Sequence, residues 1–146
     1  MARQRGRSPR LSPGTLVIDS GAVTACAKAG IQRQQLLGLL AAGWTPIAPA
    51  AVLSEALTGH GGHDARANQL LATLGAEGIA CCDETIGRKA AALRRPALQK
   101  ASPSGVDAIV AAHAAAATPS AVIMTGDPND LRALTSSHDH IRVLPI

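Results

Sequence analysis

The chain has 146 residues, a length typical of one domain that is large enough to bury a hydrophobic core. It contains no Phe, no Tyr and a single tryptophan, Trp44, which argues against a platform on which nucleic-acid bases stack, so contact with RNA or DNA would be mainly ionic. The net charge is +4, and no apolar run approaches the length that spans a bilayer, which argues against a membrane protein.

The basic residues are unevenly distributed along the chain. Four of them are arginines within the first ten residues: Arg3, Arg5, Arg7 and Arg10. The remaining basic residues equal the ten acidic ones in number, so the rest of the chain is formally neutral. We therefore expect residues 1–13 to form a basic, flexible tail and residues 14–146 to form one domain. Contact of this tail with nucleic acid is the alternative.

After the tail, short apolar segments alternate with helical patterns. The elements expected in the first half are a strand over residues 15–18, helices over 20–29 and 31–42, a strand over 44–48, and a helix from Pro49 to about residue 58. Gly43 suits the C-cap of the second helix. Because proline cannot donate a backbone hydrogen bond, Pro46 suggests an irregular or edge position for the second strand.

The second half repeats this alternation after a glycine- and histidine-rich break at residues 59–63. The elements expected there are a helix over about 64–74, a strand over 79–82, a helix capped by Asp83 that runs to about 95, a helix over 105–117, a strand over 121–124, a short helix over 128–134 and a strand over 141–144. Strands separated by helices indicate an α/β fold with a mainly parallel sheet covered on both faces.

The three cysteines, Cys26, Cys81 and Cys82, show neither a disulfide framework nor a zinc-binding spacing. Their small number is typical of a reducing compartment, and the N-terminal arginines are not followed by the apolar core of a secretion signal. We therefore expect a cytoplasmic protein. Cys81 and Cys82 are expected to be small buried residues on opposite sides of a strand.

Acidic residues follow two of the expected strands and begin a helix. Asp19 comes directly after the apolar strand at 15–18, Asp127 follows the strand at 121–124, and Asp107 lies in the first turn of the helix that begins at 105. The carboxyl ends of parallel strands meet on one side of the sheet, where α/β folds bind their ligands. Hard divalent cations need oxygen ligands gathered in this way, so the pattern predicts a metal-dependent enzyme.

Each acid also has a purely structural interpretation. Asp19 and Asp107 could cap helices, and Glu55, which lies in a largely apolar helix, could be an ordinary surface residue. Either Asp127 or Asp130 could cap the short helix that follows them. Taken together, three acids at strand ends or helix starts and one helical glutamate can converge around Mg²⁺ or Mn²⁺.

A basic strip precedes Asp107. Between residues 85 and 106 there are five basic residues and no acidic one. The five are Arg88, Lys89, Arg94, Arg95 and Lys100. The strip could be a solvated helix face, but a basic surface beside an acidic pocket suits a polyanion that is held while metal ions act on it.

Four local motifs occur in an order that resembles the PIN-domain ribonucleases, and in particular the VapC toxins of bacterial toxin–antitoxin pairs. The motifs are Ile18-Asp19-Ser20, Val52-Leu53-Ser54-Glu55, the segment from Ser104 to His113, and the segment from Thr125 to Leu131. The resemblance covers residues 15–146 and implies a PIN-like three-layer α/β/α sandwich with a mainly parallel central sheet. It also implies RNA cleavage that depends on Mg²⁺ or Mn²⁺.

Carried over by position, the resemblance implies that an acidic quartet is catalytic and binds the metal: Asp19, Glu55, Asp107 and Asp127. Ser20 and Thr125 match supporting hydroxyl positions, and Asp130 matches a more variable acid. The five residues of the basic strip are candidates for binding RNA. The resemblance further implies a homodimer and a small cognate VapB-type antitoxin.

The chain departs from the family pattern in two places. Gly21 stands where members often have Ser or a larger residue, and the arginine-rich N-terminal extension is unusual. Two other functions stay open: a housekeeping RNA-processing nuclease of the same fold without an antitoxin, and a catalytically weak module that binds an antitoxin or RNA.

Overall fold

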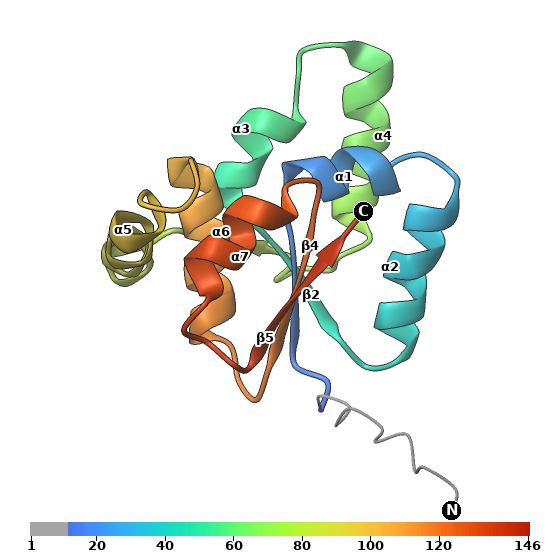
Figure 1. The fold of residues 1–146 in the computed structure, drawn as a ribbon. Coiled ribbons are helices and arrows are strands. Elements are labelled where there is room, and N and C mark those ends of the chain that lie inside the picture. The colour runs from blue at the N-terminus through green and yellow to red at the C-terminus, as the bar shows by residue number, and fades with distance from the viewer. Residues whose placement is uncertain (1–11) are drawn as a thin grey trace, which may run out of the picture.

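The structure is a computed structural model that describes residues 12–146 (Figure 1). The expected basic tail therefore lies outside the described residues, except for Ser12 and Pro13. From Gly14 onward the chain folds into strands and helices that alternate as expected.

Five parallel strands form one central sheet in the order β3-β2-β1-β4-β5. Their bounds are β1 Thr15–Ile18, β2 Thr45–Pro49, β3 Ile79–Ala80, β4 Ala121–Thr125 and β5 Ile141–Pro145. The central strand β1 pairs with β4 along its whole length, so that Ile18 lies beside Met124. Because every strand runs in the same direction, all five finish at one end of the sheet, which we call the carboxyl rim.

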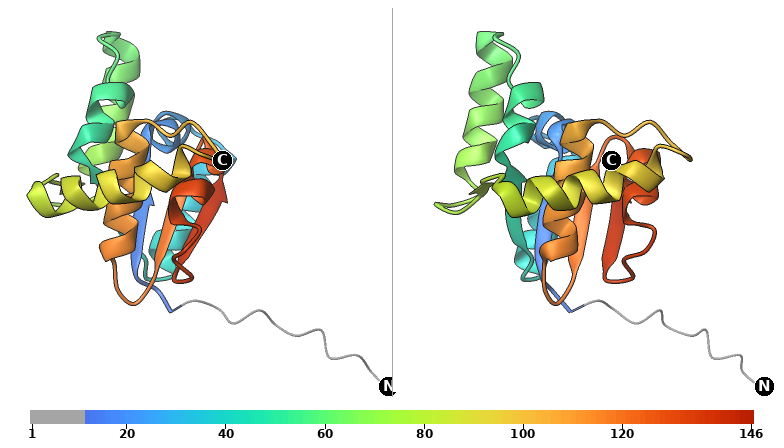
Figure 2. Two further views of the ribbon diagram at one scale, coloured as in Figure 1. Left: turned by 60° about the vertical axis from the view of Figure 1, so that its left-hand side comes forward. Right: turned by 90° about the vertical axis from the view of Figure 1, so that its left-hand side faces the viewer.

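Helices cover both faces of this sheet. Their bounds are α1 Ser20–Cys26, α2 Ile31–Ala41, the 3₁₀ helix η1 Ala50–Val52, α3 Leu53–Ala56, α4 Gly61–Ala72, α5 Glu84–Ala97, α6 Gly105–Ala116 and α7 Pro128–Thr135. Helices α6 and α7 lie on one face with α5 crossing over α6, and α1 and α2 lie on the other face (Figures 1 and 2). Helices α3 and α4 pack against α1 and extend beyond the carboxyl rim. The structure thus has the three-layer α/β/α architecture that was expected.

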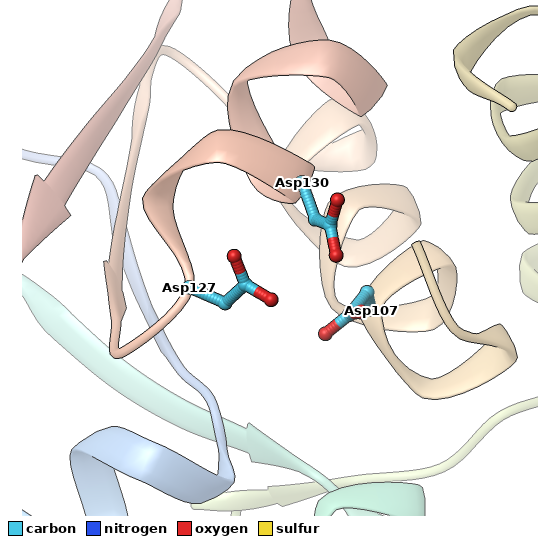
Figure 3. Close-up of side chains that lie close together, drawn as sticks. All are labelled: Asp107, Asp127 and Asp130. Carbon is cyan, nitrogen blue, oxygen red and sulfur yellow. The ribbon is translucent and has the colours of Figure 1, made fainter. Parts of the chain in front are cut away.

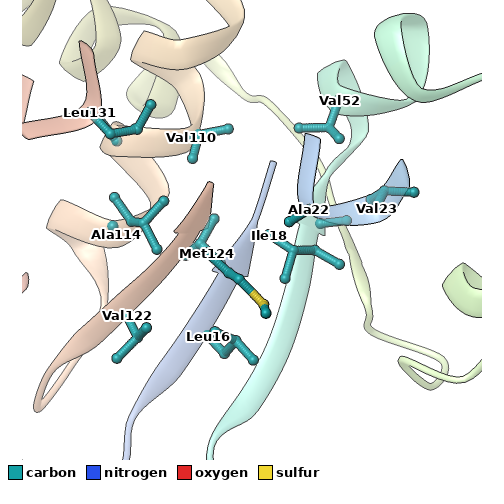
Figure 4. Close-up of a cluster of buried hydrophobic side chains, with 14 of the residues drawn as sticks. Leu16, Ile18, Ala22, Val23, Val52, Val110, Ala114, Val122, Met124 and Leu131 are labelled. Carbon is teal, nitrogen blue, oxygen red and sulfur yellow. The ribbon is translucent and has the colours of Figure 1, made fainter. Parts of the chain in front are cut away.

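The core is built from small and branched aliphatic side chains. Leu16, Ile18 and Met124 of the two central strands are fully buried in a cluster that also contains Val110 and Ala114 of α6 (Figure 4). Alanines line most of the buried side of α6, so this helix lies close against the sheet without large side chains between them.

The single tryptophan lies away from this centre. Trp44 precedes β2 at the end of the sheet opposite the carboxyl rim, where it packs against the edge of the core and its backbone N–H donates to Leu39 O at 3.2 Å. Among residues 12–146, no helix combines the length and the apolar character needed to cross a membrane.

Pro46 shows where the expectation of an irregular or edge strand needs correction. It lies in β2, which is an interior strand between β3 and β1. The N–H of Thr45 points toward β1, where it donates to Gly14 O, so the nitrogen of Pro46 points the other way. Strand β3 pairs only with Ala48 and Pro49. Beside Pro46 the described part of the chain therefore places no strand, and the missing N–H interrupts no ladder.

The expectation that Cys81 and Cys82 are buried on a strand is wrong, because β3 is short. The strand ends at Ala80 rather than at Cys82, because its pairing partner β2 ends at Pro49. Cys81 and Cys82 consequently lie after the strand, and both are exposed.

Candidate metal centre

Three carboxylates converge at the carboxyl rim. Asp107, Asp127 and Asp130 each offer one oxygen, and these three oxygens lie within 4.8 Å of one another (Figure 3). Asp107 comes from the first turn of α6, Asp127 from the turn after β4, and Asp130 from the first turn of α7. Oxygens gathered from three elements in this way can surround a single divalent cation.

Asp107 is held in place by the start of its own helix. Ser104 and Asp107 form a capping box, in which the Asp107 N–H donates to Ser104 Oγ at 3.0 Å and the Ser104 N–H donates to Asp107 Oδ2 at 2.9 Å. The expected cap is therefore present. Because these bonds use only Oδ2, the cap is compatible with a metal ligand at Oδ1.

Asp127 and Asp130 share a site in which negative charges repel one another. The side chain of Asp127 forms no capping bond to α7, and its own N–H donates to Thr125 Oγ1 at 2.8 Å. Burial raises the pKa of Asp127, and the hydrogen bond and charge of Asp130 and the charge of Asp107 raise it further, whereas the Asp130 N–H lowers it. Asp130 accepts a hydrogen bond from the Ser102 N–H at 3.1 Å, which fixes its carboxylate beside the group.

Asp19 lies next to this group but is not part of it. Its carboxylate is 5% exposed and caps α1, with Oδ1 accepting from the Ala22 N–H at 2.8 Å. Burial raises its pKa, and the negative charge of Asp107 adds to that effect. Hydrogen bonds from the Thr125 hydroxyl and from the N–H groups of Ala22 and Gly126 act in the opposite direction.

Thr125 connects Asp19 with the three-carboxylate group. This residue is fully buried at the last position of β4, and its hydroxyl hydrogen-bonds to Asp19 while accepting the N–H of Asp127. A hydroxyl can donate one bond and accept another, so a single side chain sets the positions of two acids on neighbouring strands.

Gly21 brings the two sides of the rim into close contact. A Cβ at this position would lie 3.2 Å from the backbone N and Cα of Gly126 and 3.5 Å from Asp19 Oδ1. Gly21, where the chain departs from the family pattern, therefore lies where the backbone of α1 comes close to the turn that carries Asp127.

Glu55 reaches the rim through another residue. It is exposed on α3, and its Oε2 accepts a hydrogen bond from Ser20 Oγ at 2.9 Å. Ser20 directly follows Asp19, so the contact places Glu55 at the border of the site. Like Asp19, Glu55 lies outside the group of three close carboxylates.

The donor set fits a hard divalent cation. Carboxylate oxygens are the ligands that Mg²⁺ and Mn²⁺ prefer. A bound cation would offset the repulsion that raises the pKa of Asp127.

The basic strip divides into residues with different surroundings. The Arg88 guanidinium pairs with Glu84 at 2.7 Å on the exposed face of α5. Arg94 Nε donates to Pro103 O at 2.9 Å, which holds the segment that leads into α6. The side chains of Lys89, Arg95 and Lys100 are exposed.

Sequence reasoning gave Asp130 only a supporting position, yet the structure places it in the closest acidic group. The spacing of three residues from Asp127 was the available signal, because residues three apart at the start of a helix lie on the same side. Nothing in the sequence indicated the contact between Ser20 and Glu55, because these residues are 35 positions apart in the chain.

Comparisons with known proteins identify the fold. No protein-family model matches the chain, and no curated protein matches its sequence. A chain in the crystal structure of FitAcB from Neisseria gonorrhoeae is similar in structure, with a TM-score of 0.61 and 17% identity over 88% of this chain and 96% of that chain. A chain in the structure of FitAB bound to an IR36 DNA fragment gives a TM-score of 0.63 and 18% identity over 89% and 94%. The five-stranded parallel sheet and its helices have the PIN-like fold of FitB, which confirms the expected fold.

Proposed function

We propose that this protein is a metal-dependent ribonuclease of the VapC type, the toxin of a toxin–antitoxin pair. The observation that carries the proposal is the group formed by Asp107, Asp127 and Asp130 at the carboxyl rim of a PIN-like sheet. FitB, whose fold the chain shares, is a PIN-domain toxin that pairs with the antitoxin FitA.

In this proposal Asp107, Asp127 and Asp130 would hold Mg²⁺ or Mn²⁺, with Asp19 and Glu55 completing the site directly or through water. When bound, the ion would lower the pKa of a water molecule and stabilise the charge that develops on the scissile phosphate. The three hydrogen bonds to Asp19 hold its carboxylate in place, and the hydrogen bond from Ser20 holds that of Glu55.

Cleavage of RNA by the purified protein tests the proposal. We expect cleavage with Mg²⁺ or Mn²⁺, none with EDTA, and at least about a hundredfold slower cleavage by Asp107→Asn. Glu77→Gln is the matched control, because Glu77 is an exposed acid in the connection between α4 and β3. Equal cleavage by both variants, or cleavage unaffected by EDTA, would contradict the metal mechanism.

Two further experiments separate the toxin from the other functions considered. Growth arrest on expression that is relieved by a small neighbouring gene supports a toxin with an antitoxin, whereas unaffected growth supports a housekeeping nuclease. Calorimetry with Mn²⁺ separates a nuclease from a catalytically weak binding module, which would not bind the ion. The proposal also includes a homodimer, a VapB-type antitoxin and a cytoplasmic location.

A further inference from the structure

A groove lies between α5 and α7, on the side of the molecule away from α1 and α2. It has a volume of about 360 Å³. Its lining from α5 includes Leu93 and Pro96, and its lining from α7 includes Ala133 and Leu134. The views in Figure 2 show α5 running across α6 to reach α7. The lining of this α5–α7 groove therefore combines small and apolar side chains with the polar ones of Gln99, Ser136 and Ser137.

One lysine lies on α5 before the residues that line the groove, and another lies just after the end of this helix. Lys100 lines the groove itself, and Lys89 lies three residues before Ala92, another lining residue, on the same face of the helix. Burial lowers the pKa of His138, and the nearby Lys89 and His140 lower it further, so Lys89 lies close to His138. The Lys89 end of the groove is therefore the end near His138.

A second hollow continues the groove toward β5. It has a volume of about 370 Å³, and Ser136 lines both hollows. Two arginines line it, Arg132 and Arg142, with one acid, Asp139. Lys100 in the groove and Arg132 in the second hollow outnumber this one acid, which makes the combined lining positive.

The groove also adjoins the candidate metal centre. Lys100 lies two residues before Ser102, whose N–H donates to Asp130 Oδ1. On α7, Ala133, which lines the groove, comes three residues after Asp130 and so lies on the same side of the helix. The same helix thus carries an acid of the metal group at its start and the wall of the groove along its length.

We propose that the α5–α7 groove binds the sugar–phosphate backbone of the RNA strand that leads away from the three carboxylates. The inference rests on the proposed ribonuclease function. Acids at the rim repel phosphates, so an RNA strand needs cations along its path, and Lys100 lines the groove while Arg132 lines the second hollow that shares Ser136 with it. With no Phe or Tyr in the chain and its one tryptophan at the far end of the sheet, the contact is ionic and does not depend on stacking.

The proposal changes which basic residues are assigned to RNA. Of the basic strip, Lys100 lines the groove and Lys89 lies on the same face of α5, whereas Arg88 is paired with Glu84 and Arg94 holds the Pro103 carbonyl. Arg132 joins them, although it lies outside the strip in sequence.

Binding of a fluorescently labelled single-stranded RNA in EDTA tests the groove without cleavage. The test variant is Lys100→Gln/Arg132→Gln, and the matched control is Lys28→Gln/Arg66→Gln, which removes the same charges from exposed positions after α1 and on α4. We expect the slope of log affinity against log salt to fall by about 1.4 in the test variant, because each phosphate contact to a single strand contributes about 0.7. The control keeps the wild-type slope, and thermal melting monitored by circular dichroism shows that both variants are folded.

The outcomes separate this inference from the proposed function. If the wild type binds and cuts RNA but the two double variants bind it equally, the groove assignment is wrong and the ribonuclease stands. A change in sedimentation of the test variant with unchanged RNA affinity also overturns the assignment, because the groove is then a protein interface. A wild type that neither binds nor cuts RNA overturns both.

Discussion

Asp19 is a carboxylate that the fold buries at a cost. An ionised acid that is 5% exposed loses most of its hydration, and the neighbouring charge of Asp107 opposes ionisation as well. Hydrogen bonds from Thr125, Ala22 and Gly126 offset only part of this cost, since the pKa stays raised. Buried acids with raised pKa values concentrate at functional sites, where residues needed for activity often lower the stability of the fold.

Replacing Asp19 with asparagine tests whether its charge has this effect. Asparagine keeps a side-chain oxygen for the Ala22 N–H and is an equally good N-cap, but it carries no charge. We expect Asp19→Asn to raise the free energy of unfolding of the metal-free protein at neutral pH and to abolish metal-dependent cleavage. Urea unfolding in EDTA measures the first effect. A loss of stability would show that the buried charge is better compensated than this structure indicates.

The raised pKa values of Asp19 and Asp127 also give the metal site a pH dependence. A carboxyl group whose pKa is higher in the folded state than in the unfolded state binds its proton more tightly when folded. Its contribution to stability is present below the ordinary value of 3.8 and is lost as pH rises through the folded pKa. The metal-free protein should therefore lose stability over that interval, and Mn²⁺ should restore it because the ion binds the deprotonated acids. Melting temperatures measured against pH, with Mn²⁺ and with EDTA, check this, and a metal effect independent of pH would contradict it.

At the scale of elements, the contacts that stabilise the start of α6 also position Asp107 in the candidate metal centre. The Ser104 side chain satisfies the Asp107 N–H, and Arg94 holds the Pro103 carbonyl just before it. The orientation of Asp107 thus depends on a helix cap and on a contact from α5. A substitution that removes either contact should therefore weaken metal binding.

Removing the cap measures this dependence. We expect Ser104→Ala to lower the free energy of unfolding by about 1 kcal/mol and to weaken Mn²⁺ binding, because Asp107 loses its reciprocal partner. Ser102→Ala is the control, since Ser102 contacts Asp130 through its backbone N–H, which alanine retains. Calorimetry and urea unfolding of both variants give the comparison, and equal metal affinities would argue against a role for the cap in positioning Asp107.

Much of the element order could be predicted from the sequence because apolar runs and caps are local signals. The strand at 15–18 has the predicted bounds, and Asp83 caps α5 as expected. The convergence of Asp107 and Asp127 followed from a general property of parallel sheets, in which strands end and the next helices begin on one side. The length of β3 could not be predicted, because it depends on where its neighbour β2 ends, and the place of Glu55 depends on a contact with Ser20 across the fold.

At the scale of the whole molecule, the sheet depends on a close approach at the end opposite the carboxyl rim. Gly14 leads into β1 directly beside the backbone of Ser120, which leads into β4, and a Cβ on Gly14 would overlap the Ser120 carbonyl. The N–H of Thr15 donates to that same carbonyl at 3.0 Å. The two central strands therefore begin their pairing at a point where only glycine fits.

Two glycine-to-alanine substitutions should have opposite effects on stability. We expect Gly14→Ala to lower the free energy of unfolding by about 1–3 kcal/mol, since β1 and β4 must move apart. Gly87→Ala, inside α5 with no atom within 4 Å of its added Cβ, should raise it by up to about 1 kcal/mol through helix propensity. Urea unfolding curves test both, and a neutral Gly14→Ala would mean that the strands adjust without loss of pairing.

The position of Trp44 gives the protein a built-in optical probe. With no tyrosine or phenylalanine in the chain, near-ultraviolet emission comes from this one indole, which lies between α2 and β2 at the end of the sheet remote from the acids. Its spectrum should shift to the red when the domain unfolds and stay constant when Mn²⁺ is titrated into the folded protein. A metal-induced shift would reveal a rearrangement that travels the full length of the sheet.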